Sequence, residues 1–81
     1  MTKYDIIHKI VSAFGRHEHD CDFAIISSDD CIIIQVTNKA LAIGCKHIVT
    51  IEEAIHWTNP NVVTHRIVGR LINIVRREDN K

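Results

Sequence analysis

The sequence has few of the residues that break or punctuate a chain. Its 81 residues include one proline and three glycines, so few positions favour sharp turns or flexible linkers. No apolar run comes near the roughly 20 residues that a membrane-spanning helix needs, and we expect no membrane insertion. Internal repeats and low-complexity segments are also missing. We therefore predict one domain over residues 1–81, with only a thin hydrophobic core.

The sequence also lacks an excess of charge of either sign. Ten basic and ten acidic residues give a formal net charge of +0, which removes any global attraction to nucleic acid or to an anionic membrane. The charges are unevenly distributed, however. Residues 18–53 hold seven acids and two lysines, whereas residues 54–77 hold four arginines and no acid. This asymmetry predicts surfaces of opposite sign.

The cysteine content does not suit a disulfide framework. There are three cysteines, an odd number that cannot all pair within one chain. The first ten residues carry charges at Lys3, Asp5 and Lys9, which a secretory signal peptide would not have in its apolar part. We therefore expect free thiols and a reducing, cytoplasmic location, which for a phage-encoded protein is the host cytoplasm.

Apolar residues at helical spacing predict a first helix over residues 3–15. Thr2 can cap this helix, and Asp5 then lies near its positive end. Residues 16–22 are polar and short, so we interpret them as a loop. The predicted buried stripe of the helix consists of Tyr4, Ile7, Ile10, Val11 and Phe14.

Three strands are predicted next, over residues 23–28, 31–37 and 40–49, and their short connections favour an antiparallel sheet. Alternation of residues along the strands assigns one clear core face. The opposite face is more apolar than a solvated face should be. We therefore predict a homodimer, or another homo-oligomer, through this second face. The interface residues proposed for it are Ile26, Ile33 and Ala42.

Two helices are predicted to complete the chain. Thr50 and Glu53 form the pattern of a capping box before a short helix over residues 51–58. Asn59 followed by Pro60 favours the start of a long helix over residues 60–77. The predicted fold class is α+β in the order α-β-β-β-α-α, with an antiparallel three-stranded sheet and helices packed on one face. The apolar arc of the long helix comprises Val63, Ile67, Val68, Leu71, Ile74 and Val75.

A cluster of His17, His19 and Cys21 suggests metal binding. In an extended segment these three side chains project to one side, and all three suit Zn²⁺. A closed site needs a fourth ligand, for which Cys45 or His47 could serve. The spacing matches no standard zinc motif, and a polar surface loop is the simpler interpretation. We therefore predict no bound metal.

Two groups of residues are candidates for contact with a partner. Arg66, Arg70 and Arg77 line the polar side of the last helix and suit an acidic or phosphate-bearing partner. The acidic turn at Asp29 and Asp30 is the second candidate surface. Trp57 can anchor an interface, because tryptophan and arginine contribute strongly to binding, or it can pin the short helix to the core.

Enzymatic activity has little support in the sequence. No nucleophile, base and orienting group can be placed together, and a chain of this length has little room for a substrate pocket. We expect a non-enzymatic protein without a cofactor. Buried thiols are more often small hydrophobic groups than nucleophiles, which is our interpretation of Cys31 and Cys45.

The order of helix, three strands and helix resembles the double-stranded-RNA-binding domain. That family carries lysines at the start of its last helix. The corresponding part of this sequence is near residues 50–53, which include two glutamates and no lysine, so no residue role is transferred. Zero net charge and the lack of interleaved aromatic residues also weigh against nucleic acid. A nucleic-acid-binding regulator that uses the arginines of the last helix is therefore the alternative hypothesis.

The leading hypothesis is a small protein-binding regulator or inhibitor that occludes or sequesters its partner. The sequence holds fifteen isoleucines but two leucines, which fits an AT-rich coding sequence such as that of many phages. The element order also resembles that of small phage inhibitors of bacterial defence, an analogy at the level of fold. The hypothesis therefore includes an origin in a phage or mobile element.

Overall fold

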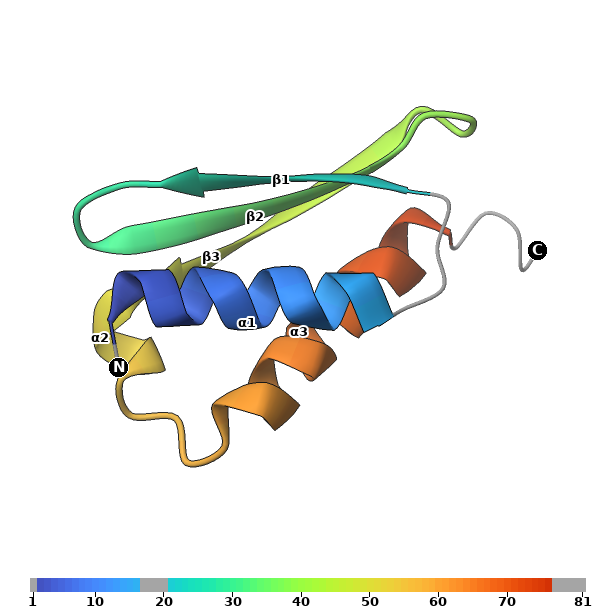
Figure 1. Ribbon diagram of the computed structural model, residues 1–81. Helices are drawn as coiled ribbons and strands as arrows, with labels where there is room; N and C mark the ends of the chain where they lie inside the picture. Colours follow the sequence, from blue (N-terminus) through green and yellow to red (C-terminus); the bar gives the residue numbers. More distant parts are fainter. Residues whose placement is uncertain (1, 17–20, 77–81) are drawn as a thin grey trace.

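The computed structural model describes residues 2–16 and 21–76. Its elements are α1 (Lys3–Arg16), β1 (Asp22–Ser27), β2 (Cys31–Asn38), β3 (Ile43–Thr50), α2 (Ile51–Ala54) and α3 (Pro60–Val75). The strands form one antiparallel sheet in the order β1-β2-β3. Helices α1 and α3 lie side by side on one face of this sheet (Figure 1). The predicted α+β fold class and element order are confirmed.

Helix α1 begins as its sequence predicts. The Asp5 amide donates to Thr2 Oγ1 at 3.3 Å, and the Thr2 amide donates to Asp5 Oδ2 at 2.9 Å. The bond from the Thr2 amide, followed by an interaction with the Thr2 side chain, lowers the pKa of the Asp5 carboxyl. Because the folded pKa is lowered, the stabilisation is present above the pKa of an unfolded aspartate and is lost as the pH falls through the folded value.

The buried face of α1 is rotated from the predicted one. Tyr4 is 76% exposed and Val11 is 44% exposed, so both were wrongly placed in the core stripe. The helix is fixed by the aromatic contact at its other end, where Phe14 stacks on Phe23 with ring centroids 4.0 Å apart. The side chains that α1 buries are Ile6, Ile10, Ala13 and Phe14.

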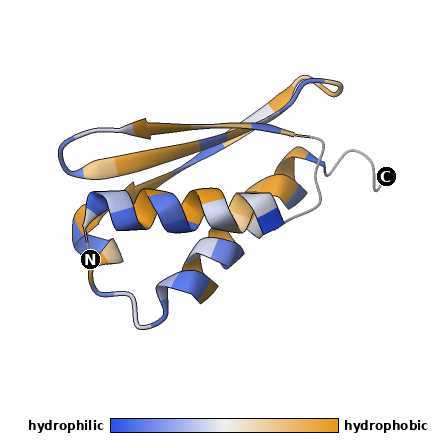
Figure 2. Cartoon of the chain, viewed as in Figure 1, coloured by the Kyte–Doolittle hydropathy of each residue, from blue (hydrophilic) through white to orange (hydrophobic). Residues whose placement is uncertain are grey.

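The sheet register sets a fully buried row on the central strand. Ile32, Ile34 and Val36 of β2 are each 0% exposed, as the predicted alternation requires. They face α1 and α3, and they join the side chains buried from the helices in one hydrophobic cluster. Hydrophobic residues also run along β1 and β2 (orange in Figure 2), because the sheet carries isoleucines on its other face as well.

The connection between β2 and β3 is longer than predicted. Strand β3 begins at Ile43, and residues 39–42 form the turn. Asn38 is buried and accepts a hydrogen bond from the Leu41 amide through Oδ1 at 3.3 Å, which curls the chain locally. Ala42 then adopts a positive φ of 55°. The prediction that Ala42 lies in a strand, on the second sheet face, was therefore wrong.

Helix α2 is one turn long, rather than extending to residue 58 as predicted. Its capping box at Thr50 and Glu53 is confirmed. After Ala54 the chain tightens, because the His56 and Trp57 amides donate to carbonyls three residues back instead of four. The Trp57 amide donates to the Ala54 carbonyl at 3.2 Å. This tightening positions Asn59, whose Oδ1 accepts from the Val62 amide at 3.4 Å and caps α3.

The capping box makes a testable contribution to stability. We expect Thr50→Ala to lower the free energy of unfolding by about 1 kcal/mol, because the Glu53 amide loses the acceptor that lies 3.1 Å away. Urea denaturation followed by circular dichroism measures the loss. Thr58→Ala is the matched control, since Thr58 is exposed and caps no helix. Equal stabilities of the two variants would contradict the assigned role.

Helix α3 buries a narrower arc than its sequence suggested. Ile74 is 37% exposed and lies with the arginines on the outer surface, which contradicts its predicted place in the core. The residues buried from α3 are Thr64, Val68, Leu71, Ile72 and Val75. Thr64 fits among them because its hydroxyl donates to the Pro60 carbonyl at 2.9 Å. None of the described helices has the length and hydropathy to cross a bilayer.

Candidate binding groove

A groove between the last helix and the neighbouring edge strand is the candidate site, here named the α3–β3 groove. Its inner surface is apolar, because Leu71 is buried and both Cys45 and Ile67 pack against the core. The Cys45 thiol donates to the Leu71 carbonyl at 3.6 Å, which joins the two walls. The groove is lined by Cys45, Lys46, His47, Arg66, Ile67, Arg70, Leu71 and Ile74.

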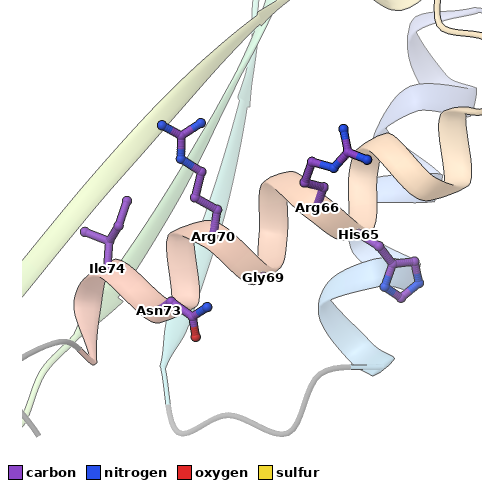
Figure 3. Close-up of a pocket in the computed structure, with 6 residues that line it drawn as sticks. All are labelled: His65, Arg66, Gly69, Arg70, Asn73 and Ile74. Atoms are coloured by element: carbon purple, nitrogen blue, oxygen red, sulfur yellow. The ribbon is translucent and has the colours of Figure 1, made fainter. Parts of the chain in front are cut away.

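The α3 side of the groove is cationic. Arg66 and Arg70 are one helical turn apart on α3 and are exposed, whereas Lys46 lines the β3 side from a register position on the uncovered face of the sheet. Figure 3 shows both arginines projecting to the same side of α3, as Ile74 does, while His65 projects elsewhere. The same two arginines also line a shallow depression on the outer surface of the helix, together with Gly69.

The structure gives neither Arg66 nor Arg70 a polar partner in the part of the chain that it describes. Within residues 2–16 and 21–76, the guanidinium groups of Arg66 and Arg70 make no hydrogen bond or ion pair. The ion pair recorded in that part of the chain joins Lys39 Nζ and Asp22 Oδ2 at 3.1 Å, away from the groove. Each guanidinium group carries about five N–H donors in a rigid fork geometry. The donors of both neighbouring arginines are therefore available to a ligand.

The positive surface continues onto the first helix. A depression between α1 and α3 is lined by Lys9 and Arg16 among other residues. Lys9 Nζ donates to Asn61 Oδ1 at 3.1 Å, and Arg16 Nη1 lies 3.4 Å from His65 Nε2. Among the residues that line these three depressions, none is acidic. The helix layer thus presents one extended cationic surface.

The described acids gather mainly at the opposite end of the molecule. The Ile51 amide donates to the Asp30 carbonyl at 2.9 Å, which brings α2 against the β1–β2 turn. Lys3 Nζ donates to the Ser28 carbonyl at 3.2 Å, so the start of α1 meets the same turn (Figure 1). The acids collected at this end are Asp5, Asp29, Asp30, Glu52 and Glu53.

The predicted partner-binding residues therefore do not form one surface. Arg66 and Arg70 lie together at the groove, whereas Asp29 and Asp30 lie at the acidic end. Trp57 is half-buried and packs against the hydrophobic cluster, which matches the core interpretation of this residue. Arg77 lies outside the described residues.

The predicted metal ligands are not brought together by the described structure. His17 and His19 lie outside the described residues, and Cys21 is 7% exposed. Burial, with a smaller effect of Cys21, raises the pKa of the Cys45 thiol and so opposes the thiolate that a metal requires. No group of three or more histidines, cysteines or acids within residues 2–16 and 21–76 could hold a metal ion.

Two of the three residues predicted for an oligomer interface share one face of the sheet, and the interface itself stays a prediction. Ile26, Ile33 and Ile48 are direct cross-strand partners on the sheet face that no helix covers. Ile26 is 49% exposed and Ile48 is 55% exposed. Ala42 lies in the β2–β3 turn, and Ile48 lies beside Ile33 on this face instead.

Sequence reasoning missed the β3 wall of the groove. The sequence analysis gave Lys46 no role, and it considered His47 only as a metal ligand. Nothing in the local sequence shows that they approach α3, because about twenty residues separate Lys46 from Arg66. Comparison with protein-family models, with curated proteins and with solved structures found no match to this chain.

Proposed function

We propose that this protein is a non-enzymatic regulator that binds an acidic segment of another protein in the α3–β3 groove and thereby occludes it. The observation that supports this most is the combination of unengaged Arg66 and Arg70 with an apolar interior. Carboxylates of a partner can form charge-assisted, bidentate bonds with the guanidinium groups. An apolar side chain of the same segment can fill the space over Cys45 and Ile67.

The groove suits a protein segment better than a nucleic acid. The phosphates of a nucleic acid could bind the arginines of the groove. The bases of a single strand, however, need aromatic side chains on which to stack. The aromatic residues of the described chain are Tyr4, Phe14, Phe23 and Trp57, and none of them lines the groove. The formal net charge of +0 also gives no long-range attraction to a polyanion.

Charge reversal at the groove tests the proposal. Peptides are selected on the immobilised protein from a random library, and their affinities are measured by fluorescence anisotropy. We expect the selected peptides to combine acidic with apolar residues. We expect Arg66→Glu/Arg70→Glu to weaken their binding at least about tenfold, about 1.4 kcal/mol, because attraction becomes repulsion.

The matched control is Lys3→Glu/Lys39→Glu. It changes the net charge by the same amount, but both lysines lie outside the groove. Peptides without acids, or equal loss of binding in both double variants, would contradict the proposal. Binding of duplex DNA or RNA, measured in parallel, with a steep decrease as salt rises and a loss confined to the groove variant, would favour the nucleic-acid alternative.

A further inference from the structure

The outer edge of β1 carries backbone groups that none of the described strands pairs with. In the β1–β2 ladder, the Ser28 amide donates to the Cys31 carbonyl at 3.0 Å, beside the pair of Ser27 and Ile32. Hydrogen-bonded and non-hydrogen-bonded pairs alternate along an antiparallel ladder. The backbone groups of Ala24 and Ile26 therefore point toward β2. Those of Phe23, Ile25 and Ser27 point outward from the sheet.

This edge has few of the features that normally protect an edge strand. Native proteins block such edges with charges, prolines, bulges or a covering element. Between Asp22 and Ser27 the strand holds only apolar residues, and Phe23 is 39% exposed. Helix α3 packs mainly against β3 and β2 (Figure 1), and α1 contacts β1 through the stacking of Phe14 on Phe23 on the helix-covered face of the sheet.

The opposite edge of the sheet is better protected. The Ile51 amide donates to the Asp30 carbonyl, so the same alternation directs the backbone groups of Gly44, Lys46 and Ile48 outward from β3. A lysine therefore lies in the middle of this edge, and α3 packs beside it. The two edges differ, and β1 is the one that favours pairing with another strand.

We propose that β1 pairs antiparallel with β1 of a second copy of this chain, so that two three-stranded sheets join into one. The two-fold axis passes between the two Ile25 residues. In this register Ile25 opposes Ile25 of the second copy, and Phe23 opposes its Ser27. Every outward-pointing residue of β1 then forms a hydrogen-bonded pair. A shift by two residues in either direction would leave at least one of them without such a partner inside the strand.

The side chains of β1 are compatible with this register. On the face away from the helices, Ala24 opposes Ile26 of the second copy, so a small side chain meets a large one. Asp22 opposes Ser28, so no two like charges meet, which cross-strand pairing disfavours. The formal net charge of +0 also gives no general repulsion between copies. These properties favour a second copy over an unrelated strand.

Proline substitution on the two edges tests the proposal. Proline is tolerated on an edge strand where the amide it removes points to solvent. We expect the wild-type protein to sediment as a concentration-dependent dimer. Ser27→Pro should raise the dimer dissociation constant at least about tenfold, because both copies lose an inter-subunit donor. Gly44→Pro, which removes an outward amide of β3 at a position where an added Cβ meets only ordinary contacts, should leave the dimer unchanged. Circular dichroism checks that each variant folds.

Amide hydrogen exchange of the wild-type protein gives an independent measurement that needs no variant. We expect the amides of Phe23, Ile25 and Ser27 to be protected at high protein concentration and to exchange faster on dilution. Those of Gly44, Lys46 and Ile48 should exchange at rates independent of concentration. A monomer at all concentrations, a Ser27→Pro variant that remains folded and dimeric, or protection confined to the β3 edge would each overturn the proposal.

Discussion

Replacement of Phe14 by alanine is expected to lower the free energy of unfolding by about 3–5 kcal/mol. Phe14 is 1% exposed and stacks on Phe23 at 4.0 Å, so its removal leaves a cavity between α1 and the sheet. A chain of this length has a total stability of roughly 4–12 kcal/mol. The loss is therefore about a quarter of this total or more. Urea denaturation at a fixed protein concentration measures the change.

Tyr4→Ala provides the control for this prediction on the same helix. Tyr4 is also aromatic but is 76% exposed, so its truncation should change stability by less than about 0.5 kcal/mol. Similar losses in both variants would mean that helix propensity, rather than packing under the sheet, determines the effect. A Phe14→Ala protein as stable as the wild type would contradict the described core.

Replacement of Asn38 by alanine is expected to cost about 2–4 kcal/mol. The Asn38 side chain is 3% exposed. Its Nδ2 donates to the Val75 carbonyl at 3.3 Å, and its Oδ1 accepts from the Leu41 amide. Alanine leaves both backbone groups without these bonds, the Val75 carbonyl at a buried site and the Leu41 amide at a part-buried one. The β2–β3 turn and the end of α3 should then separate, and hydrogen exchange at the Leu41 amide reports the opening directly.

Asn73→Ala is the corresponding control. Asn73 is exposed on α3 and belongs to the depression on its outer surface, so we expect a stability within about 0.5 kcal/mol of the wild type. If Asn38→Ala were equally mild, water would be replacing the amide, and Asn38 would not hold the turn to α3.

The two proposals are compatible in space. β1 and β3 are opposite edges of the sheet, so pairing through β1 leaves the α3–β3 groove of each copy open. A dimer would therefore carry two grooves, one near each end of the joined sheet. A partner with two acidic segments could engage both, and the second contact would then be intramolecular.

Local sequence was sufficient for features that depend on neighbouring residues. The starts of all three helices follow from side chains that satisfy amides three residues away, at Thr2, Thr50 and Asn59. Alternation along β2 also identified its buried row, because side chains of a strand alternate between two faces whatever its neighbours are. These features allowed the element order and the antiparallel sheet to be predicted.

Features that depend on distant contacts could not be predicted in this way. Tyr4 and Ile74 fit the helical pattern of a buried arc, but the direction in which α1 and α3 dock leaves them exposed. Ala42 was assigned to a strand because its neighbours are apolar. The turn instead forms around Asn38, whose other bond is to Val75, 37 residues further along the chain.

The sequence by itself determined which segments are helices and strands, which strand is central to the core, and that a polar, arginine-bearing side of the last helix faces outward. Helix capping and hydrophobic periodicity depend on residues a few positions apart, so they can be recognised from the sequence of each segment. Only the tertiary structure decided that Arg66 and Arg70 lie beside Cys45 and His47 of β3 at an apolar groove, and that Ile48 joins Ile26 and Ile33 on the uncovered face. Those neighbours result from helix docking and strand register, which depend on the packing of the whole core.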